Sequence, residues 1–269
     1  MKPISFLGPK GTYTHEAAST ISDNLISYCT IPAVLDSVTN GECDKGVVPI
    51  ENSIEGAVSQ TLDLFVHKHD LKICDEIILP INHNLVVNKE VKLDEIKDVY
   101  SHSQALGQCQ GFINENNFQP HFAISTANAV KSIIGNNSSA AIGNKKAAEL
   151  YDMEILISNI QDVSNNETRF VVVSNEDHEP TGNDKTSIAF SLYEDNPGAL
   201  YKILEIFYKA HVNLTKIESR PSKEGLGDYI FFLDFYGHRK EEKIHEILSQ
   251  VEKTTATLKI LGSYPIFSY

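Results

Sequence analysis

The chain has 269 residues, of which 41% are apolar and 22% charged, as is typical of a globular protein of about two domains rather than of a disordered or fibrous chain. The 36 Asp and Glu residues outnumber the 23 Lys and Arg residues, so the formal net charge is -13. This charge would repel a nucleic-acid backbone or an anionic membrane, and we expect neither as a partner. An anionic ligand would need local cations, of which only three are arginines: Arg169, Arg220 and Arg239.

The four cysteines are widely spaced and form no Cys-x-x-Cys pair, standing at Cys29, Cys43, Cys74 and Cys109. This spacing predicts reduced, mostly buried thiols and indicates neither a disulfide framework nor a zinc site. The N-terminus turns polar after Leu7, and no stretch approaches the roughly 18 apolar residues of a membrane span. We therefore expect a cytoplasmic protein with no signal peptide, no membrane contact and no metal.

Short apolar runs in the N-terminal part predict strands at residues 4–7, 46–50, 85–87, 98–100, 140–142, 155–157 and 170–173. Between them, apolar residues recur at helical spacing in residues 57–65 and 105–113. This alternation predicts an α/β architecture with a mainly parallel sheet. Ligands of such folds bind in a crevice beyond the carboxyl ends of the strands.

Residues 174–184 are polar, contain Pro and Gly and have no apolar period, which predicts an exposed linker at a domain boundary. The order then becomes strand, helix, strand, strand, helix, strand, at residues 186–193, 197–210, 213–219, 229–236, 241–253 and 257–266. Both helices carry one apolar stripe, so they should cover one face of an antiparallel sheet. This βαββαβ order is the ferredoxin-like split unit. The predicted domains are residues 1–175 and 185–266.

Three polar segments lie between a predicted strand and a helical pattern. They are the glycine-rich residues 8–16, the trio Glu51, Asn52 and Ser53, and residues 101–108. Each is placed to offer backbone N–H groups or side chains to a polar ligand in the crevice. A plain turn or a helix cap explains each segment as well, so the residues alone leave both interpretations open.

Thr168 and Arg169 precede the most apolar strand. A guanidinium beside a hydroxyl suits a carboxylate next to a group that needs a hydrogen bond. An arginine on the surface is the commoner outcome, but the scarcity of arginine in this chain favours a functional role for Arg169.

The C-terminal unit has two segments of interest. Asn196 and Pro197 are predicted as the N-cap and the first residue of a helix. Glu218 and Arg220, near the end of the next strand, form a candidate ion pair. Free N–H groups at a helix start together with a charged pair suit a zwitterionic amino acid.

Six segments, taken in order, resemble the prephenate dehydratase family with its C-terminal ACT regulatory domain over nearly the whole chain. Any one of them is weak, but six in order are highly specific. Only Ser103, where the family pattern has Pro, and Asn144, where it has Ser, depart from it. The segments are Gly8-Pro9-Lys10-Gly11-Thr12-Tyr13-Thr14, Pro49-Ile50-Glu51-Asn52-Ser53, Ser101-His102 with Gln104 and Gln108-Cys109, Ala140-Ala141-Ile142-Gly143, Asn166 with Thr168-Arg169-Phe170, and Glu218-Ser219-Arg220-Pro221.

The resemblance implies a catalytic part of two α/β lobes, like a periplasmic-type binding protein with a cleft between them, and an ACT domain that binds phenylalanine as feedback inhibitor. It implies the loss of CO2 and of the ring hydroxyl from prephenate, giving phenylpyruvate, with no cofactor or metal. Dimers or tetramers through the ACT domains are expected. Because the glycine-rich segment begins at Gly8, a fused chorismate mutase or dehydrogenase is not expected.

The resemblance also carries roles to individual residues. Catalytic roles fall to Thr168, Glu51, Asn52, Ser101 and Gln108. Substrate-binding roles fall to Thr12, Ser53, Arg169 and Phe170. Phenylalanine-binding roles fall to Asn196, Pro197, Gly198, Ala199, Leu200, Asn213, Leu214, Glu218, Ser219 and Arg220.

In the implied mechanism, Arg169 holds a substrate carboxylate and Thr168 donates a hydrogen bond to the departing hydroxyl, while Glu51 holds the network or relays a proton. Two rival hypotheses stay open. One is a non-catalytic amino-acid sensor that binds without turnover. The other is an arogenate dehydratase, since spacing does not distinguish a keto from an amino group.

Overall fold

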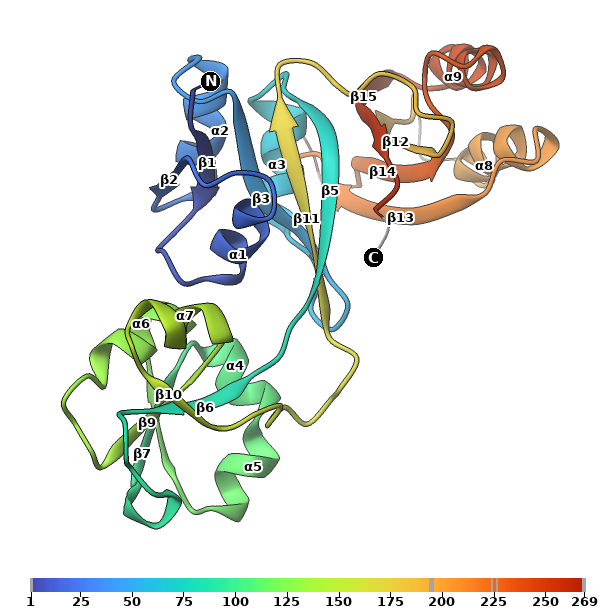
Figure 1. Ribbon diagram of the computed structural model, residues 1–269. Helices are drawn as coiled ribbons and strands as arrows, with labels where there is room; N and C mark the ends of the chain where they lie inside the picture. Colours follow the sequence, from blue (N-terminus) through green and yellow to red (C-terminus); the bar gives the residue numbers. More distant parts are fainter. Residues whose placement is uncertain (1, 194–195, 224, 226, 268–269) are drawn as a thin grey trace. The chain divides into compact units, whose positions relative to one another are not determined.

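Figure 1 shows the computed structural model, which describes residues 2–193, 196–223, 225 and 227–267. The chain divides into two compact units, and each is assembled from segments that are far apart in the sequence. The first unit contains residues 2–34, 47–56 and 78–170. The second contains residues 35–46, 57–77 and the chain from residue 171 onward.

The first sheet has the strand order β2-β1-β3-β11-β5, and the short β4 pairs with β3. Residues 170–173 of β11 are all apolar and at most 2% exposed, as expected for a strand covered on both faces. The strands are β1 (Ile4–Leu7), β2 (Leu25–Tyr28), β3 (Lys45–Asn52), β4 (Gly56–Ala57), β5 (Lys72–Pro80) and β11 (Glu167–Ser174). The helices between them are α1 (Tyr13–Ser19), α2 (Ile31–Thr39) and α3 (Ser59–His67).

The second sheet, β10-β6-β9-β7-β8, is mixed, where a mainly parallel sheet was predicted. β7 runs parallel to β8 and β9, but β6 is antiparallel to β9 and β10. Because β6 follows β5 of the first sheet after residues 81–83, no helical crossover ties its direction to the other strands. The strands are β6 (Asn84–Val87), β7 (Asp98–Ser101), β8 (Gln119–Phe122), β9 (Ser139–Gly143) and β10 (Glu154–Ile157).

Alternate side chains of the second sheet enter two separate cores. Leu85 and Ile142 pack with α4 and α5, whereas Val86 and Ala141 pack with α6 and α7. This second lobe is therefore a three-layer α/β/α sandwich, with the two helix pairs on opposite faces (Figure 1). Its helices are α4 (Ser103–Gln108), α5 (Gln110–Glu115), α6 (Thr126–Ser132) and α7 (Lys145–Leu150), with a 3-10 turn at Leu93–Glu95.

The third sheet is antiparallel throughout, with the order β13-β14-β12-β15. Ile203 and Phe207 of α8 and Val251 of α9 share one core with Leu233, so both helices cover one face of the sheet (Figure 1). The predicted βαββαβ order is confirmed, with every boundary within two residues of its predicted place. The elements are β12 (Asp184–Ser191), α8 (Ala199–Lys209), β13 (Leu214–Pro221), β14 (Tyr229–Tyr236), α9 (Glu242–Thr254) and β15 (Thr257–Pro265).

The start of α8 differs from the prediction. Its N-cap is Gly198, at φ 84°, and not Asn196. The backbone N–H of Ala199 donates to the carbonyl of Asn196 at 3.0 Å, so these residues form a β-turn around Pro197 and Gly198. Pro followed by a residue with positive φ is the signature of a type II turn, which glycine adopts without strain.

Residues 174–184 are mostly exposed, as predicted, but polar contacts hold the segment in place. The guanidinium of Arg239 donates to Asp177 Oδ1 at 2.9 Å, and the Asp177 side chain is only 5% exposed. His178 N donates to the carbonyl of Ser263 at 3.1 Å. The segment is held by an ion pair and hydrogen bonds rather than by apolar burial, which is why its hydropathy gave no sign of this packing.

Within the second unit, the C-terminal domain packs on residues 57–77. A Cβ on Gly262 would stand 2.1 Å from the carbonyl oxygen of Ile73, so the two backbones touch there and only glycine fits. Lys185 Nζ lies 2.8 and 2.9 Å from the two carboxylate oxygens of Glu76. Both side chains of this pair are almost entirely removed from water.

Arg220 at the end of β13 also contacts this region. Its Nε lies 2.8 Å from Asp63 Oδ1 and its Nη2 3.2 Å from Asp63 Oδ2, a two-point contact with α3. The carboxylate that Arg220 binds is therefore that of Asp63, whereas the sequence suggested Glu218.

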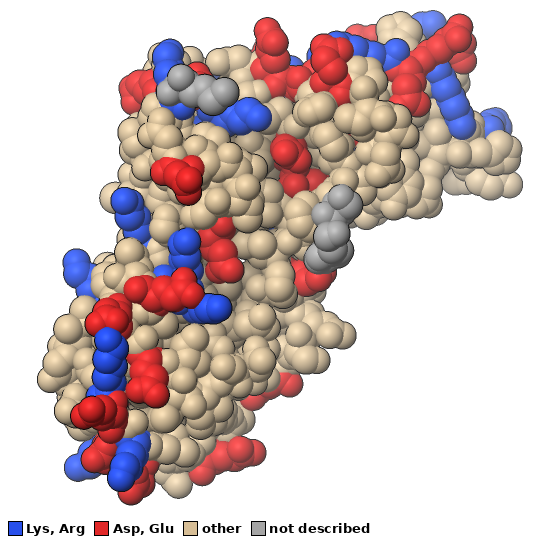
Figure 2. All heavy atoms as spheres, in the orientation of Figure 1, with Lys and Arg blue, Asp and Glu red and all other residues tan. Residues whose placement is uncertain are grey.

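The remaining composition-based expectations concern thiols, membranes and charge. Cys43, Cys74 and Cys109 are buried and Cys29 is exposed, and all four thiols are free. Among the described residues, no helix is both long and apolar enough to cross a membrane. On the face shown in Figure 2, Lys and Arg side chains lie interspersed with Asp and Glu rather than gathered into one basic patch.

Candidate active site

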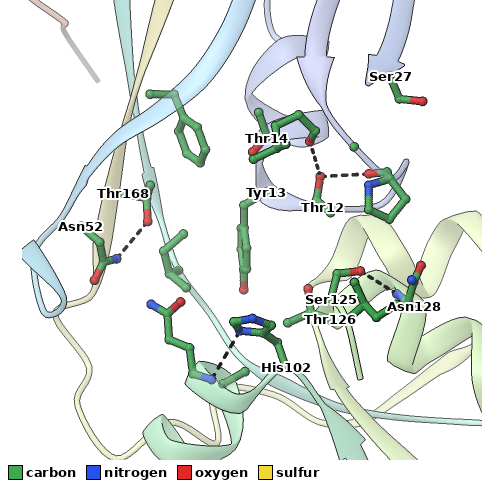
Figure 3. Close-up of a pocket in the computed structure, with 18 of the residues that line it drawn as sticks. Thr12, Tyr13, Thr14, Ser27, Asn52, His102, Ser125, Thr126, Asn128 and Thr168 are labelled. Atoms are coloured by element: carbon green, nitrogen blue, oxygen red, sulfur yellow. Dashed lines mark hydrogen bonds between the residues drawn. The ribbon is translucent and has the colours of Figure 1, made fainter. Parts of the chain in front are cut away.

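A cavity of about 660 Å3 lies within the first unit. It is lined by the ends of strands from the first two sheets and by the helix starts that follow them, the location predicted for a ligand (Figure 3). The predicted site residues in the lining are Thr12, Asn52, Gln108, Thr168 and Phe170. Its other polar side chains are Tyr13, Thr14, Ser27, Tyr28, Cys29, His83, His102, Gln104, Ser125, Thr126 and Asn128.

The ends of the neighbouring strands β3 and β11 divide the predicted residues between two faces. Asn52 and Thr168 line the cavity, whereas Glu51 and Arg169 lie outside its lining. Arg169 Nη1 instead stands 3.5 Å from Glu51 Oε2. Successive side chains of a strand point to opposite faces, so Thr168 and Arg169 do not both face one ligand. The contact of Arg169 with a substrate carboxylate stays a prediction, and in this structure the guanidinium faces Glu51.

Asn52 ties the end of β3 to the cavity. Its Oδ1 accepts from the backbone N–H groups of Ile54 and Glu55, each at 3.0 Å, which fixes the turn after the strand. Its Nδ2 donates to Thr168 Oγ1 at 2.9 Å, as Figure 3 shows. Asn52 thus serves both as a local cap and as a wall of the cavity. Since Thr168 Oγ accepts from Asn52, its own hydrogen is available for an acceptor in the cavity.

Gln108 joins the same network from the second lobe. Its Oε1 accepts from Asn166 Nδ2 at 2.9 Å and lies 2.8 Å from His83 Nε2. Burial lowers the pKa of His83, and the hydrogen bond with Gln108 opposes this shift only in part, so the imidazole is neutral at physiological pH. Asn166 also bonds to Asn52, so Asn52, Gln108 and Thr168 belong to one network.

Thr12 lies at the start of α1. Its Oγ accepts from His15 N at 3.3 Å and donates to the carbonyl of Pro9 at 3.0 Å, so it caps the helix while lining the cavity. Just before it, a Cβ on Gly11, which has φ 91°, would stand 3.3 Å from atoms of Ala127 and Ala147. Glycine lets this loop approach α6 and α7 closely.

Ser53 and Ser101, which were predicted to act on substrate, lie outside the lining. Ser101 is fully buried and donates to the carbonyl of Ile142 at 2.7 Å, which links β7 to β9. Ser53 Oγ accepts from Glu167 N at 2.9 Å and holds the start of β11. In this structure both hydroxyls are used to fix the backbone that carries the site.

Comparison with known protein families identifies the family of this chain. A family model described as prephenate dehydratase matches residues 4–178, which is more than half of the chain. The chain belongs to the prephenate dehydratase family. A second model, described as the ACT domain, matches residues 186–253. The resemblance inferred from six short motifs is thereby confirmed.

Several relatives of this family member are similar over nearly their whole length. It is 44% identical to the prephenate dehydratase of Methanocaldococcus jannaschii, with 99% of each chain covered. A crystal structure of prephenate dehydratase from Arthrobacter aurescens in complex with L-Phe has a TM-score of 0.89 at 35% identity, covering 98% of this chain and 90% of that one. GqqA, described as a novel type of quorum quenching acylase, has a TM-score of 0.88 at 27% identity, covering 99% and 98%.

Sequence analysis of this family member missed the start of α6. Ser125, Thr126 and Asn128 line the cavity, and Ser125 Oγ accepts from Asn128 N at 3.0 Å (Figure 3). In that view they lie on the opposite side of Tyr13 from Thr168. The segment obeys the same rule as the predicted ones, a polar helix start after a strand. It was overlooked because β8 is Gln-Pro-His-Phe, a short polar strand without an apolar run.

The lining has a distinctive chemistry. It offers hydroxyl, amide and imidazole groups, and no Lys, Arg, Asp or Glu residue among those that the structure describes there. Nor does the described part of the chain contain a group of three or more His, Cys, Asp or Glu residues arranged to hold a metal ion. An anion in this cavity would be held by neutral hydrogen-bond donors.

Proposed function

We propose that the chain converts prephenate to phenylpyruvate, CO2 and water. The C–C bond to the ring carboxylate breaks, and its electron pair moves through the ring and expels the hydroxyl at the opposite carbon as hydroxide. The hydroxide then takes a proton from the solvent to give water. Aromatisation of the ring drives the reaction. Besides the family, one observation carries the proposal: the Thr168 hydroxyl accepts from Asn52, so its hydrogen can be donated to the departing oxygen.

Binding and catalysis would share the neutral donors of the cavity. Hydroxyl and amide groups such as Thr14, Ser125 and Asn128 can hold the two substrate carboxylates, because hydrogen bonds to charged groups are each worth about 1.5–3 kcal/mol. Arg169 and Glu51 would contribute indirectly, because their ion pair joins the ends of β3 and β11. A threonine hydroxyl is a weak acid, so Thr168 stabilises the leaving oxygen rather than giving up its proton outright.

A turnover assay tests this proposal against its rivals. The full chain is mixed with prephenate or arogenate, and phenylpyruvate or phenylalanine is followed. We expect phenylpyruvate from prephenate at a higher kcat/KM than phenylalanine from arogenate. Preference for arogenate would reassign the substrate. Binding of prephenate without product would instead identify a sensor.

We further propose that the ACT domain binds L-phenylalanine as feedback inhibitor, as the complex of the Arthrobacter relative suggests. Asn196, Pro197 and Ala199 line a small pocket of about 200 Å3 at the start of α8. The other proposed effector residues lie on the rest of this turn and helix, on β13, the edge strand of the sheet, or directly before it: Gly198, Leu200, Asn213, Leu214, Glu218, Ser219 and Arg220.

Arg220 would transmit the effector signal through Asp63. Burial raises the pKa of Asp63, but hydrogen bonds from Arg220 and Lys223 outweigh this and hold the pKa below its usual range. Asp63→Asn should weaken inhibition by phenylalanine by about 5-fold or more, the lower end of typical coupling energies, while leaving phenylalanine affinity nearly unchanged. Calorimetry measures the affinity and steady-state assays the inhibition.

Asp36→Asn is the matched control for Asp63→Asn, because Asp36 pairs with the exposed Lys68, away from Arg220. Phenylalanine should inhibit the Asp36→Asn control as strongly as it inhibits the unaltered protein. Loss of phenylalanine affinity in parallel with inhibition would contradict the coupling role and place Arg220 and Asp63 in the effector site itself.

A cytoplasmic location and a homodimer or homotetramer formed through the ACT domains complete the proposal. The edge strand β13 and the exposed side chains of Tyr201, Tyr208 and Ile217 support such pairing, because a covered edge strand and buried aromatic rings stabilise an interface. Light scattering would show a monomer if this part of the proposal is wrong.

A further inference from the structure

The direction of every hydrogen bond in the network around Thr168 can be derived from two backbone groups. Ile54 N and Glu55 N both point to one terminal atom of the Asn52 side chain, at 3.0 Å. A backbone N–H only donates, so that atom is the oxygen. The other terminal atom of Asn52 is therefore the NH2 group, which only donates.

The same reasoning fixes the next two amides. The Asn52 NH2 group lies 2.7 Å from a terminal atom of Asn166, which must be the oxygen. The NH2 group of Asn166 then lies 2.9 Å from Gln108, and its partner must again be the oxygen. Reversing either amide would set two NH2 groups against each other, at a cost of an unmade hydrogen bond on each side.

The chain of amides ends at His83. Gln108 Oε1 can only accept, so His83 Nε2, at 2.8 Å, must carry a proton. His83 is 3% exposed, and its ring packs edge to face on Tyr13, with 6.3 Å between ring centroids. In the neutral ring Nδ1 is then an acceptor, and this buried atom has no partner among the described residues.

Both ends of this network offer hydrogens. Thr168 Oγ accepts from Asn52, which leaves the Thr168 hydrogen to donate. Gln108 Oε1 already accepts two hydrogen bonds, and its Nε2 is buried without a partner in the described structure. A buried donor without a partner in a ligand cavity calls for an explanation, and an acceptor oxygen of the ligand would satisfy it.

We propose that His83 is a positioning residue for the reaction: by donating from Nε2 it locks Gln108 with its NH2 group toward substrate. At the other end of the network, the backbone N–H groups of Ile54 and Glu55 orient Asn52, which keeps the Thr168 hydroxyl a donor. This inference rests on the proposed function for its kinetic consequence. The tautomer of His83, however, follows from the hydrogen bonds alone and can be measured without turnover.

The kinetic test compares two substitutions of His83. In His83→Gln an amide NH2 group takes the place of imidazole Nε2–H, so kcat should stay within about 5-fold of the unaltered chain. His83→Leu keeps the bulk but removes the donor, and kcat should fall by about 10–100-fold with little change in KM, because the donors are misplaced rather than lost. Equal rates for the two variants would overturn the proposal.

The second test is 15N NMR of the chain labelled in its histidines, with His83→Gln used to assign the signal. We expect a protonated-type shift at Nε2 and an unprotonated-type shift at Nδ1. The opposite tautomer, or an imidazolium, would overturn the inference whatever the activity. Asn166→Asp should also shift the His83 signals, because a carboxylate there cannot donate to Gln108. Unchanged signals in this variant would mean that the network does not set the tautomer.

Discussion

Thr168→Ala should lower kcat for prephenate by about 10²–10³-fold, the cost of removing one donor from a developing oxyanion. Thr168 lines the cavity, and its oxygen accepts from Asn52 Nδ2 at 2.9 Å, which leaves one hydrogen for the departing hydroxyl. Steady-state kinetics on prephenate measure the effect. Circular dichroism and the unfolding midpoint should be nearly unchanged, because the substitution removes a hydroxyl and a methyl group beside an existing cavity.

Two matched substitutions separate the hydroxyl from its surroundings. Thr168→Ser keeps the donor and should retain most of the activity. Arg169→Lys alters the next residue, whose side chain lies 3.5 Å from Glu51 and outside the cavity lining, so its loss should be smaller than that of Thr168→Ala. If Arg169→Lys proves the more damaging, Arg169 contacts substrate after all.

Lys185→Met should destabilise the second unit by about 3–5 kcal/mol, because it leaves the carboxylate of Glu76 buried without its cation. The Glu76 side chain is 1% exposed and that of Lys185 11%. Both carboxylate oxygens lie within 2.9 Å of Lys185 Nζ. Urea unfolding followed by tryptophan-independent signals, such as far-UV circular dichroism, measures the free energy, since the chain contains no Trp.

The exposed pair of Lys68 and Asp36 provides the comparison. Lys68→Met removes the same kind of ion pair at side chains that are 51% and 43% exposed, and should cost about 1 kcal/mol or less. The double change Lys185→Met with Glu76→Met should recover most of the lost stability, since two well-packed apolar side chains replace a buried pair at little cost. If Lys185→Met alone loses less unfolding free energy than Lys68→Met, water reaches the Glu76 carboxylate.

Much of the fold followed from the sequence because apolar periodicity reports burial directly. The C-terminal domain was predicted within two residues at every boundary, since Ile203, Phe207 and the matching residues of α9 repeat at helical spacing. The mixed second sheet was not predicted. The direction of β6 depends on the sheet in which it pairs, and apolar periodicity does not indicate which sheet a strand joins.

The predicted site residues divide between the cavity and its surroundings for one physical reason. Motifs gather residues that are adjacent in sequence, whereas a strand separates neighbours onto opposite faces. Asn52, Thr168 and Phe170 therefore reach the cavity, and Glu51 and Arg169 do not. The two-residue period of a strand, applied to the motif residues in the sequence, would have separated the residues that line the cavity from those that do not. Nothing in the spacing indicated His83, whose role depends on amides that are brought together only by folding.

The close contact between Gly262 and Ile73 has a consequence for synthesis on the ribosome. Residues 57–77 pack in one unit with strands that are made much later. At about 5–20 residues per second, roughly 10–40 s separate the translation of Ile73 from that of Gly262. Ile73 and Phe65, fully buried in the finished protein, lack part of their covering during that interval. The N-terminal part therefore completes its folding only after the regulatory domain has emerged, and a nascent chain stalled before β15 would be a natural client for chaperones.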